Sequence, residues 1–152
     1  MGFNEGHSAA ALLLSSKTLN VVSIEVGEEE HVSRAAALLS SLFPGRLEVI
    51  RQNSSLALPM LAERSLQCDL VRIDGSHVGD MPWLDLLNSK LVASGPRIVW
   101  MDDVGCSNWN CREPTAAWER AKREGLVDEV ECSVSQETES HGYCIATFAP
   151  KL

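Results

Sequence analysis

Carboxylate, amide and imidazole side chains occur directly after four stretches of the sequence that have the pattern of buried strands. These polar clusters are Glu25, Asn53-Ser54, Asp74-Gly75-Ser76-His77 and Asp102-Asp103. In open α/β sheets, ligands bind outside the carboxyl ends of the strands, so polar clusters at four such ends predict an active site. Any one of them alone would be an ordinary loop, and the prediction depends on their coincidence.

Three of these side chains are carboxylates that follow two neighbouring strand patterns, Asp74, Asp102 and Asp103. Three converging negative charges repel one another unless a cation neutralises them, and hard oxygen ligands suit Mg²⁺. A bound Mg²⁺ would acidify and orient a substrate hydroxyl as a Lewis acid. Metal ligation and plain loop polarity stay open as two interpretations. His77 is a candidate general base, with a loop or helix-capping histidine as the alternative.

A glycine-containing loop, Gly2-Phe3-Asn4-Glu5-Gly6, leads into a predicted helix. Glycines let a ligand approach the backbone, and the helix N-terminus favours an anionic or carboxylate group. The loop lacks the G-x-G-x-x-G pattern of dinucleotide-binding proteins, and its own spacing is a weak signal. Glu25 follows the next strand, where an acid can accept hydrogen bonds from both hydroxyls of a ribose. Together they predict a nucleoside-containing ligand, with an exposed loop carboxylate as the alternative.

Helical and strand patterns alternate along the chain, which predicts an α/β fold with a mainly parallel sheet. We expect strands at 19–25, 47–51, 69–74 and 97–101, and helices at 7–16, 28–42, 55–64, 79–91 and 114–123. Two final strands, 126–134 and 142–148, have no helix between them and predict an antiparallel hairpin. Without a linker or repeat in its 152 residues, the chain is expected to form a single domain, 1–152.

The composition predicts a protein that acts on small molecules. The net charge of -8 disfavours the phosphate backbone of nucleic acid as a partner. The apolar run at 8–14 is too short to span a membrane and has no basic residues before it, so we expect a cytoplasmic protein without a membrane partner. Cys106 and Cys111 lack a second ligand pair at zinc-finger spacing, and all five cysteines are expected to be free thiols. The oligomeric state stays open.

The chain resembles the class I S-adenosylmethionine-dependent methyltransferases, in particular the small-molecule O-methyltransferases related to catechol and macrolide methyltransferases. The matching stretches are GFNEGHSAAALL, VVSIEVG, RQNSSLALPML, DLVRIDGSHVGDMPWLDLLNSKLVASGPRIVWMDDV and PTAAWERAKREGLV. They follow in the family's order over nearly the whole chain, and the spacing from IDGSH to DDV is the most specific. The resemblance implies a Rossmann-like fold with a mainly parallel sheet, helices on both faces and a C-terminal antiparallel hairpin. It also implies that the chain begins at the glycine loop and lacks the first, central strand.

The resemblance implies roles for the polar residues in binding S-adenosylmethionine. The residues implied for the cofactor are Gly2, Asn4 and Gly6 at its methionine end, Glu25 at the ribose, Asn53 and Ser54 at the adenine, and Asp74 nearby. The family more often has Gly-Asp-Ser where this chain has Gln52-Asn53-Ser54, which weakens the adenine assignment. Metal-dependent relatives place carboxylate ligands at the positions of Asp74, Asp102 and Asp103. Asp74 and His77 are the expected catalytic residues.

The expected function is methyl transfer from S-adenosylmethionine to an oxygen of a small-molecule acceptor, with Mg²⁺ assistance as one form of the reaction. A nicotinamide-dependent oxidoreductase of Rossmann type is a second hypothesis, which the missing third glycine and the terminal hairpin disfavour. A non-catalytic remnant that keeps the sheet as an interaction module is a third, which Gln52-Asn53 and the absent first strand favour. The three differ in whether the chain binds adenosylhomocysteine, NAD or neither.

Overall fold

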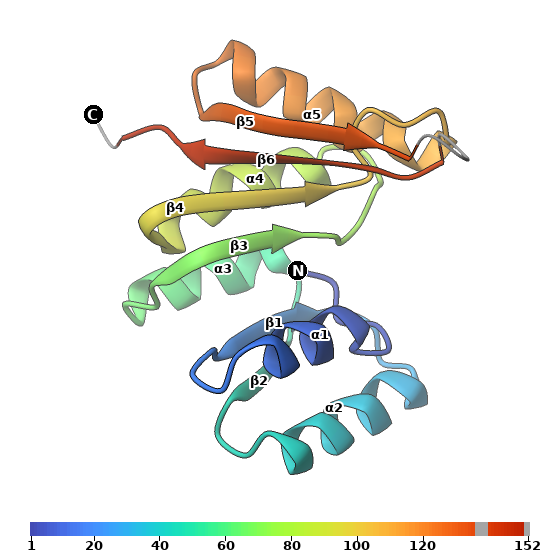
Figure 1. Cartoon of the computed structure of the whole chain (residues 1–152), viewed down its shortest axis with the longest axis vertical. Coiled ribbons are helices and arrows are strands. Elements are labelled where there is room, and N and C mark those ends of the chain that lie inside the picture. Colours follow the sequence, from blue (N-terminus) through green and yellow to red (C-terminus); the bar gives the residue numbers. More distant parts are fainter. Residues whose placement is uncertain (136–139, 151–152) are drawn as a thin grey trace. The chain divides into compact units, whose positions relative to one another are not determined.

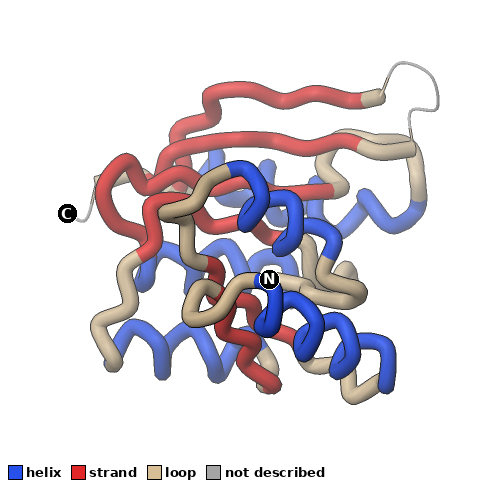
Figure 2. Tube along the Cα trace, turned by 60° about the horizontal axis from the view of Figure 1, so that its bottom comes forward, coloured by secondary structure: helices blue, strands red, loops and turns tan. Residues whose placement is uncertain are grey.

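The structure is a computed structural model that describes residues 1–135 and 140–150. The chain divides into two compact units, Met1–Ala57 and Leu58–Leu152 (Figure 1). Along the trace, helices and strands alternate until the last helix, after which two strands follow one another (Figure 2). This order is the predicted α/β pattern with a terminal strand pair. The prediction of a single domain stays a prediction.

The first unit consists of the glycine loop and two helix–strand pairs. Its elements are α1 (His7–Ser15), β1 (Val21–Glu25), α2 (Glu30–Leu42), β2 (Leu47–Arg51) and the start of α3 (Ser54–Glu63). β1 and β2 are parallel, with Val21 opposite Leu47 and Glu25 opposite Arg51. The carboxyl ends of both strands therefore meet at one edge. A small core of Phe3, Ala9, Val32 and Leu39 holds the glycine loop and the two helices together.

The second unit contains a four-stranded sheet in the order β3-β4-β6-β5. Its elements are the rest of α3, β3 (Cys68–Ile73), α4 (Met81–Val92), β4 (Ala93–Asp102), the short 3₁₀ helix η1 (Trp109–Cys111), α5 (Arg112–Arg123), β5 (Val127–Val134) and β6 (Gly142–Phe148). β3 and β4 are parallel, whereas β6 runs antiparallel to both β4 and β5. The predicted hairpin is confirmed, and it places a reversed strand beside a parallel pair.

β4 begins earlier than the sequence predicted. The run Ser94-Gly95-Pro96 was expected to be a loop before a strand at 97–101, but it lies inside β4. Gly95 and Arg97 both have left-handed backbone conformations, with φ of 54° and 52°. The register between β3 and β4 also shifts between Cys68 and Leu70. The strand therefore accommodates the turn residues as a bulge.

β1 and β3 each have one strand partner among the described residues, so the two units carry separate sheets. The first strand in chain order follows the glycine loop. Next to β1, the backbone N–H of Gly2 donates to the carbonyl of Ile24 at 3.1 Å. No helix in the described ranges has the length and apolar character needed to cross a bilayer.

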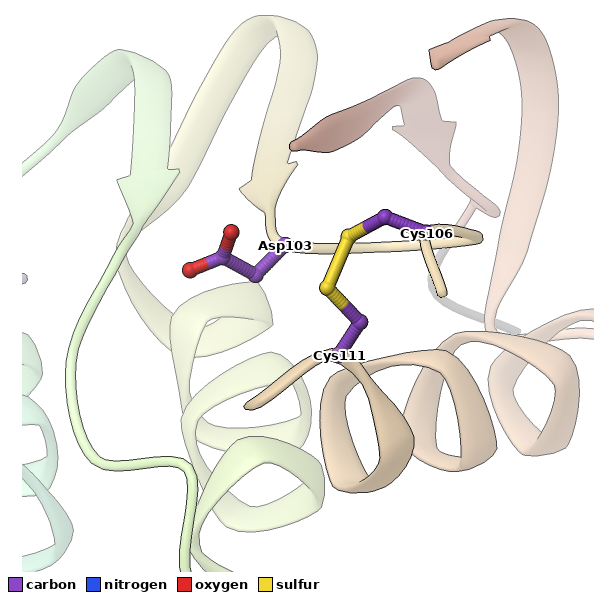
Figure 3. A group of neighbouring side chains, drawn as sticks. All are labelled: Asp103, Cys106 and Cys111. Carbon is purple, nitrogen blue, oxygen red and sulfur yellow. A yellow bond between two sulfur atoms is a disulfide. The ribbon is translucent and has the colours of Figure 1, made fainter. Parts of the chain in front are cut away.

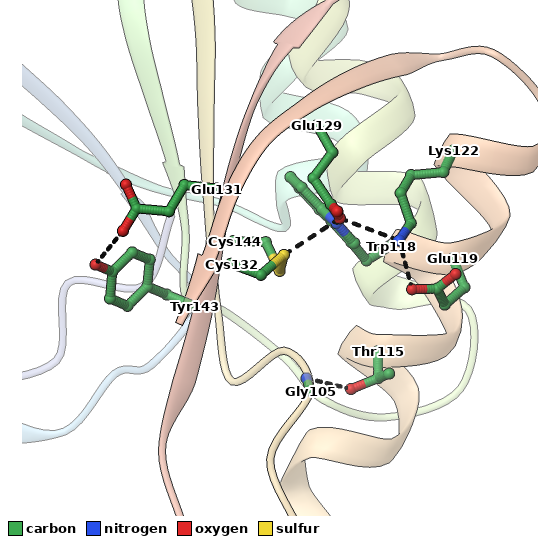
Figure 4. The surroundings of a disulfide bond; sticks show 10 residues. All are labelled: Gly105, Thr115, Trp118, Glu119, Lys122, Glu129, Glu131, Cys132, Tyr143 and Cys144. Atoms are coloured by element: carbon green, nitrogen blue, oxygen red, sulfur yellow. Dashed lines mark hydrogen bonds and ion pairs between the residues drawn. A yellow bond between two sulfur atoms is a disulfide. The ribbon is translucent and has the colours of Figure 1, made fainter. Parts of the chain in front are cut away.

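Four of the five cysteines form disulfides, so the expectation of five free thiols is wrong. Cys106 pairs with Cys111 and Cys132 with Cys144, and Cys68 remains free. Cys132 and Cys144 are directly opposite each other on β5 and β6 (Figure 4). Sequence spacing alone did not predict this pairing, because it depends on which strands become neighbours.

Candidate functional site

The carboxylate of Glu25, at the end of β1, binds the backbone of the glycine loop. Its Oε2 accepts the N–H groups of Phe3 and Asn4, each at 2.8 Å, and its Oε1 accepts the N–H of Gly27 at 2.7 Å. Burial would raise the pKa of Glu25, but the hydrogen bonds from Asn4, Gly27 and Phe3 outweigh it and lower the pKa. The side chain is therefore an ionised acceptor that holds two turns of backbone in place.

The glycine loop has an unusual backbone at three positions. Gly2, Asn4 and Gly6 all have positive φ values, of 79°, 45° and 76°. A Cβ on Gly6 would lie 2.8 Å from a methyl carbon of Leu39 and 2.9 Å from the ring of Phe3. Gly6 is therefore required by the turn and by core packing, irrespective of any ligand. The predicted grouping of these three residues with Glu25 is present in the first unit.

Asn53 and Ser54 lie at the start of α3, just beyond the carboxyl end of β2. The side-chain oxygen of Asn53 accepts the N–H and O–H of Ser55 at 2.9 and 2.7 Å, and its backbone carbonyl accepts the N–H of Leu56 at 3.0 Å. Asn53 thus caps the helix, which is the ordinary role of asparagine at this position. Its amide nitrogen is the group by which it would contact an adenine.

An apolar residue that the sequence argument missed follows Glu25 directly. The Val26 side chain is 69% exposed in the loop after β1. Isolated exposed apolar residues are common, and Val26 is of interest only because it lies beside the carboxylate of Glu25. It offers an apolar surface on which a flat base could pack.

In the second unit, Asp74 follows the end of β3 and Asp102 ends the neighbouring strand β4. The two strands are parallel and place Ile73 opposite Met101, which brings both aspartates to the same edge. Arg72 lies between them: its Nη1 is 2.9 Å from Oδ2 of Asp74, and its Nη2 is hydrogen-bonded to Oδ2 of Asp102. The predicted convergence of these carboxylates is thus present, but the cation bound to two of them is a guanidinium.

Arg72 was not among the predicted site residues because it lies inside an apolar strand pattern, DLVRID. A charged side chain in such a run usually has a partner, and this was the signal available. The protein itself supplies part of the positive charge that relieves this repulsion, through the guanidinium of Arg72. Metal ligation by the three carboxylates stays a prediction.

Asp103 lies between two histidine rings. Its Oδ2 is 3.5 Å from Nε2 of His77, and its Oδ1 is 3.7 Å from Nδ1 of His141. Asp103 has a positive φ of 56°, which is uncommon for a residue with a side chain. The side chain of His141 is 80% exposed and faces Asp103. The candidate base His77 therefore has a carboxylate directed at one of its two nitrogens.

The charges of this cluster do not balance. Three carboxylates, Asp74, Asp102 and Asp103, meet one guanidinium, so -3 and +1 leave -2 when the histidines are neutral. Burial raises the pKa of Asp74, Arg72 opposes the shift, and the charges of Asp102 and Asp103 add to it. Ligand atoms of Asp74, His77 and Asp103 lie within 4.8 Å of one another. The residual charge and this spacing fit one divalent cation, whose first contacts would be Asp74 and Asp103, because Asp102 is not part of the group of ligand atoms that lie this close together.

Comparison with known proteins identifies the fold. No protein-family model and no curated protein sequence matches the chain. Solved structures that match include the pyocyanin biosynthetic protein PhzM (TM-score 0.68, 11% identity), an O-methyltransferase from Bacillus cereus in complex with SAH (0.74, 15%) and a fibrillarin pre-rRNA processing protein from Methanococcus jannaschii (0.60, 12%). The matches cover 97%, 96% and 87% of this chain, and 48%, 71% and 57% of the three structures.

The chain therefore spans about half the length of PhzM and more of the other two. Sequence identities this low show the fold and nothing finer. The fold is that of the class I S-adenosylmethionine-dependent methyltransferases, as the sequence resemblance implied.

Proposed function

We propose that this chain, which has the class I methyltransferase fold, transfers a methyl group from S-adenosylmethionine to an oxygen of a small-molecule acceptor. The observation that carries the proposal is the hydrogen-bonded unit of the glycine loop and Glu25. A loop held by a carboxylate at the end of the next strand provides both a cradle of backbone groups and an acceptor for ribose hydroxyls.

In this proposal, the first unit binds the cofactor. Gly2, Asn4 and Gly6 shape the loop around its methionine end, and the α1 N-terminus that follows favours a carboxylate. An ionised carboxylate offers about four lone-pair positions, so Glu25 retains acceptor capacity beyond its three backbone bonds. Asn53, Ser54 and the exposed Val26 provide the polar and apolar contacts for the adenine.

The second unit is proposed to bind the acceptor hydroxyl. When bound, S-adenosylmethionine supplies an electrophilic methyl group, and Mg²⁺ supplies positive charge that acidifies the hydroxyl. Asp74 and Asp103 would hold the ion, and Asp102 would join them where its contact with Arg72 opens. His77 would take the hydroxyl proton on Nδ1, because its Nε2 faces Asp103, which keeps the ring oriented.

The nature of the acceptor is inferred from charge. With a net charge of -8, the protein disfavours long polyanions, and a small neutral or cationic hydroxyl compound fits better. The fold alone does not choose the acceptor, because one matching structure is described as a pre-rRNA processing protein. The acceptor assignment therefore depends on this chain's own net negative charge.

The two other hypotheses make different binding predictions. A nicotinamide-dependent oxidoreductase should be stabilised by NAD, and a non-catalytic remnant by neither cofactor. Thermal unfolding in the presence of adenosylhomocysteine, NAD or no ligand separates the three. At about a hundred times its dissociation constant, adenosylhomocysteine should add about 2.7 kcal/mol to the free energy of unfolding. Stabilisation by NAD instead, or by neither ligand, would refute the proposed function.

A further inference from the structure

Two cysteines and a carboxylate meet in the loop between β4 and α5, beside the proposed acceptor site. Cys106 and Cys111 form a disulfide with their Cα atoms 5.6 Å apart. An oxygen of Asp103 and the two sulfurs all lie within 4.8 Å of one another (Figure 3). The proposed methyl transfer uses Asp103 but gives no role to the two sulfurs.

We propose that the reduced form of Cys106 and Cys111 binds Zn²⁺ together with Asp103. Two thiolates and a carboxylate are established zinc ligands, and a separation of two to four residues between cysteines is typical of zinc sites. Cys106 and Cys111 are separated by four residues. The spacing of the cysteines in the sequence did not reveal a further ligand. In the structure Asp103, which follows β4, is close enough to be that ligand.

The thiol state requires a reductant, and a dithiol is the class that supplies it. The S–S bond takes two electrons and two protons from the dithiol and becomes two thiols, while the dithiol becomes a disulfide. Zn²⁺ then displaces both thiol protons into solvent and is bound by two thiolates and the Asp103 carboxylate. In the disulfide state the sulfurs are bonded to each other and carry no charge, so this site is absent.

The loop has hydrogen bonds that do not depend on the disulfide. The carbonyl of Asn108 accepts the N–H of Cys111 at 2.9 Å, and its side chain accepts the N–H of Asn110 at 3.2 Å. At the other end of the loop, the N–H of Gly105 donates to Oγ1 of Thr115 at 2.8 Å (Figure 4). Cys111 is fully buried at the start of α5. The two cysteines should therefore stay close together after reduction.

The fourth position of the ion would be open to water or to one of the histidines. His77 and His141 face the two oxygens of Asp103 at 3.5 and 3.7 Å. Three protein ligands and one exchangeable position are a common arrangement for Zn²⁺. Both imidazoles therefore lie next to the carboxylate that would bind the ion, and either could supply the fourth ligand.

The second disulfide provides a matched control. Cys132, Cys144 and Glu129 also lie within 4.8 Å of one another. However, Oε2 of Glu129 accepts the N–H of the Trp118 ring at 2.6 Å and lies 3.1 Å from the ammonium group of Lys122 (Figure 4). A cation already occupies the vicinity of this carboxylate and would repel a metal ion. We expect the Cys132–Cys144 pair to bind zinc far more weakly.

Cobalt and zinc titrations of the full chain test the proposal. The chain is reduced with a dithiol, the dithiol is removed without oxygen, and Co²⁺ is added, followed by Zn²⁺. We expect one equivalent of Co²⁺ to produce a thiolate-to-cobalt charge-transfer band, which Zn²⁺ abolishes. The oxidised chain should give no such band. Binding only at the aspartate–histidine cluster would lack the band as well.

Variants locate the ion. Cys106→Ser and Asp103→Asn should weaken binding at least about tenfold, the equivalent of about 1.4 kcal/mol. The control variant Cys132→Ser, at an exposed position, should keep it. Cys106 is only half-buried, so its serine variant avoids the packing defect expected at the fully buried Cys111. The proposal fails if the band survives in Cys106→Ser, disappears in the control variant or is absent from the reduced wild type. It also fails if reduction abolishes the far-ultraviolet circular dichroism of the chain, because the site requires a loop that keeps its shape.

Discussion

The carboxylate of Glu25 accepts the backbone N–H of Asn4 at 2.8 Å, across 21 residues of sequence. This bond, with those from Phe3 and Gly27, makes the shape of the glycine loop depend on one charge at the end of β1. The same carboxylate is the proposed ribose acceptor. Loop order and cofactor affinity should therefore respond together when Glu25 is changed.

The first prediction is that Glu25→Gln loosens the loop. In this variant the three N–H groups lose their anionic acceptor. We therefore expect faster hydrogen exchange at the amides of Phe3, Asn4 and Gly27. The local opening free energy should fall by about 1–2 kcal/mol. Glu28→Gln is the control, because Glu28 is exposed in the same loop. Equal protection of these amides in both variants would contradict the role assigned to Glu25.

The stability of the first unit should also depend on pH with a definite sign. The folded-state pKa of Glu25 lies below its unfolded value of about 4.3, so the unfolded state binds more protons between the two values. The contribution is complete above the unfolded pKa and is lost as the pH falls through the folded pKa. Protection of the three amides should therefore decline in acid in the wild type beyond the intrinsic change in exchange rate. In Glu25→Gln that extra decline should be absent.

Much of the fold could be predicted because it depends on local patterns. The β-branched run before Glu25 and the apolar run before Asp102 form strands as expected, and β2 and β6 begin and end at the predicted residues. α2 ends at Leu42 as predicted, and Pro44-Gly45 follows it. The terminal hairpin followed from the absence of a helical period between two strands. Each of these features is determined by residues within a few positions of one another.

The parts of the candidate site that were missed depend on contacts between distant segments. Arg72 bridges Asp74 and Asp102 only because β3 pairs with β4. The disulfide between Cys132 and Cys144 likewise requires the β5–β6 register. The sequence indicated which side chains are polar and where the strands end. Strand pairing determines which of these charged side chains neutralise one another, and the sequence pattern does not specify that pairing.

The second prediction concerns Arg72→Met, which leaves Asp74 and Asp102 without their guanidinium. The side chains of Arg72, Asp74 and Asp102 are between 24% and 33% exposed, so the loss should lie between that of a surface pair and a buried one. We expect unfolding of the second unit to become easier by about 1–3 kcal/mol. All four tryptophans lie in this unit, so tryptophan fluorescence during urea unfolding reports on it.

Magnesium should compensate for the missing guanidinium. We expect Mg²⁺ to stabilise Arg72→Met more than the wild type, because the uncompensated charge of the cluster is larger in the variant. Arg123→Met, at the exposed end of α5, is the control and should behave like the wild type. If Mg²⁺ stabilises all three proteins equally or none of them, the cluster is not a divalent-cation site.

The third prediction separates metal assistance from cofactor binding. A chelator should abolish methyl transfer and leave adenosylhomocysteine affinity nearly unchanged. Asp102→Asn should lower turnover more than cofactor affinity, whereas Asp128→Asn, an exposed position on β5, should change neither. Full activity in excess chelator would exclude the metal role and leave His77 as the base that acts without an ion.

Calorimetric titration with adenosylhomocysteine tests the central claim most directly. The claim is that Glu25 and the glycine loop form the cofactor site. The wild-type chain and Glu28→Ala should bind adenosylhomocysteine with equal affinity, NAD should give no binding heat, and Glu25→Ala should weaken the affinity at least about tenfold, the equivalent of about 1.4 kcal/mol. Equal affinity in Glu25→Ala and the wild type, or no binding by a folded wild-type chain, would contradict the account.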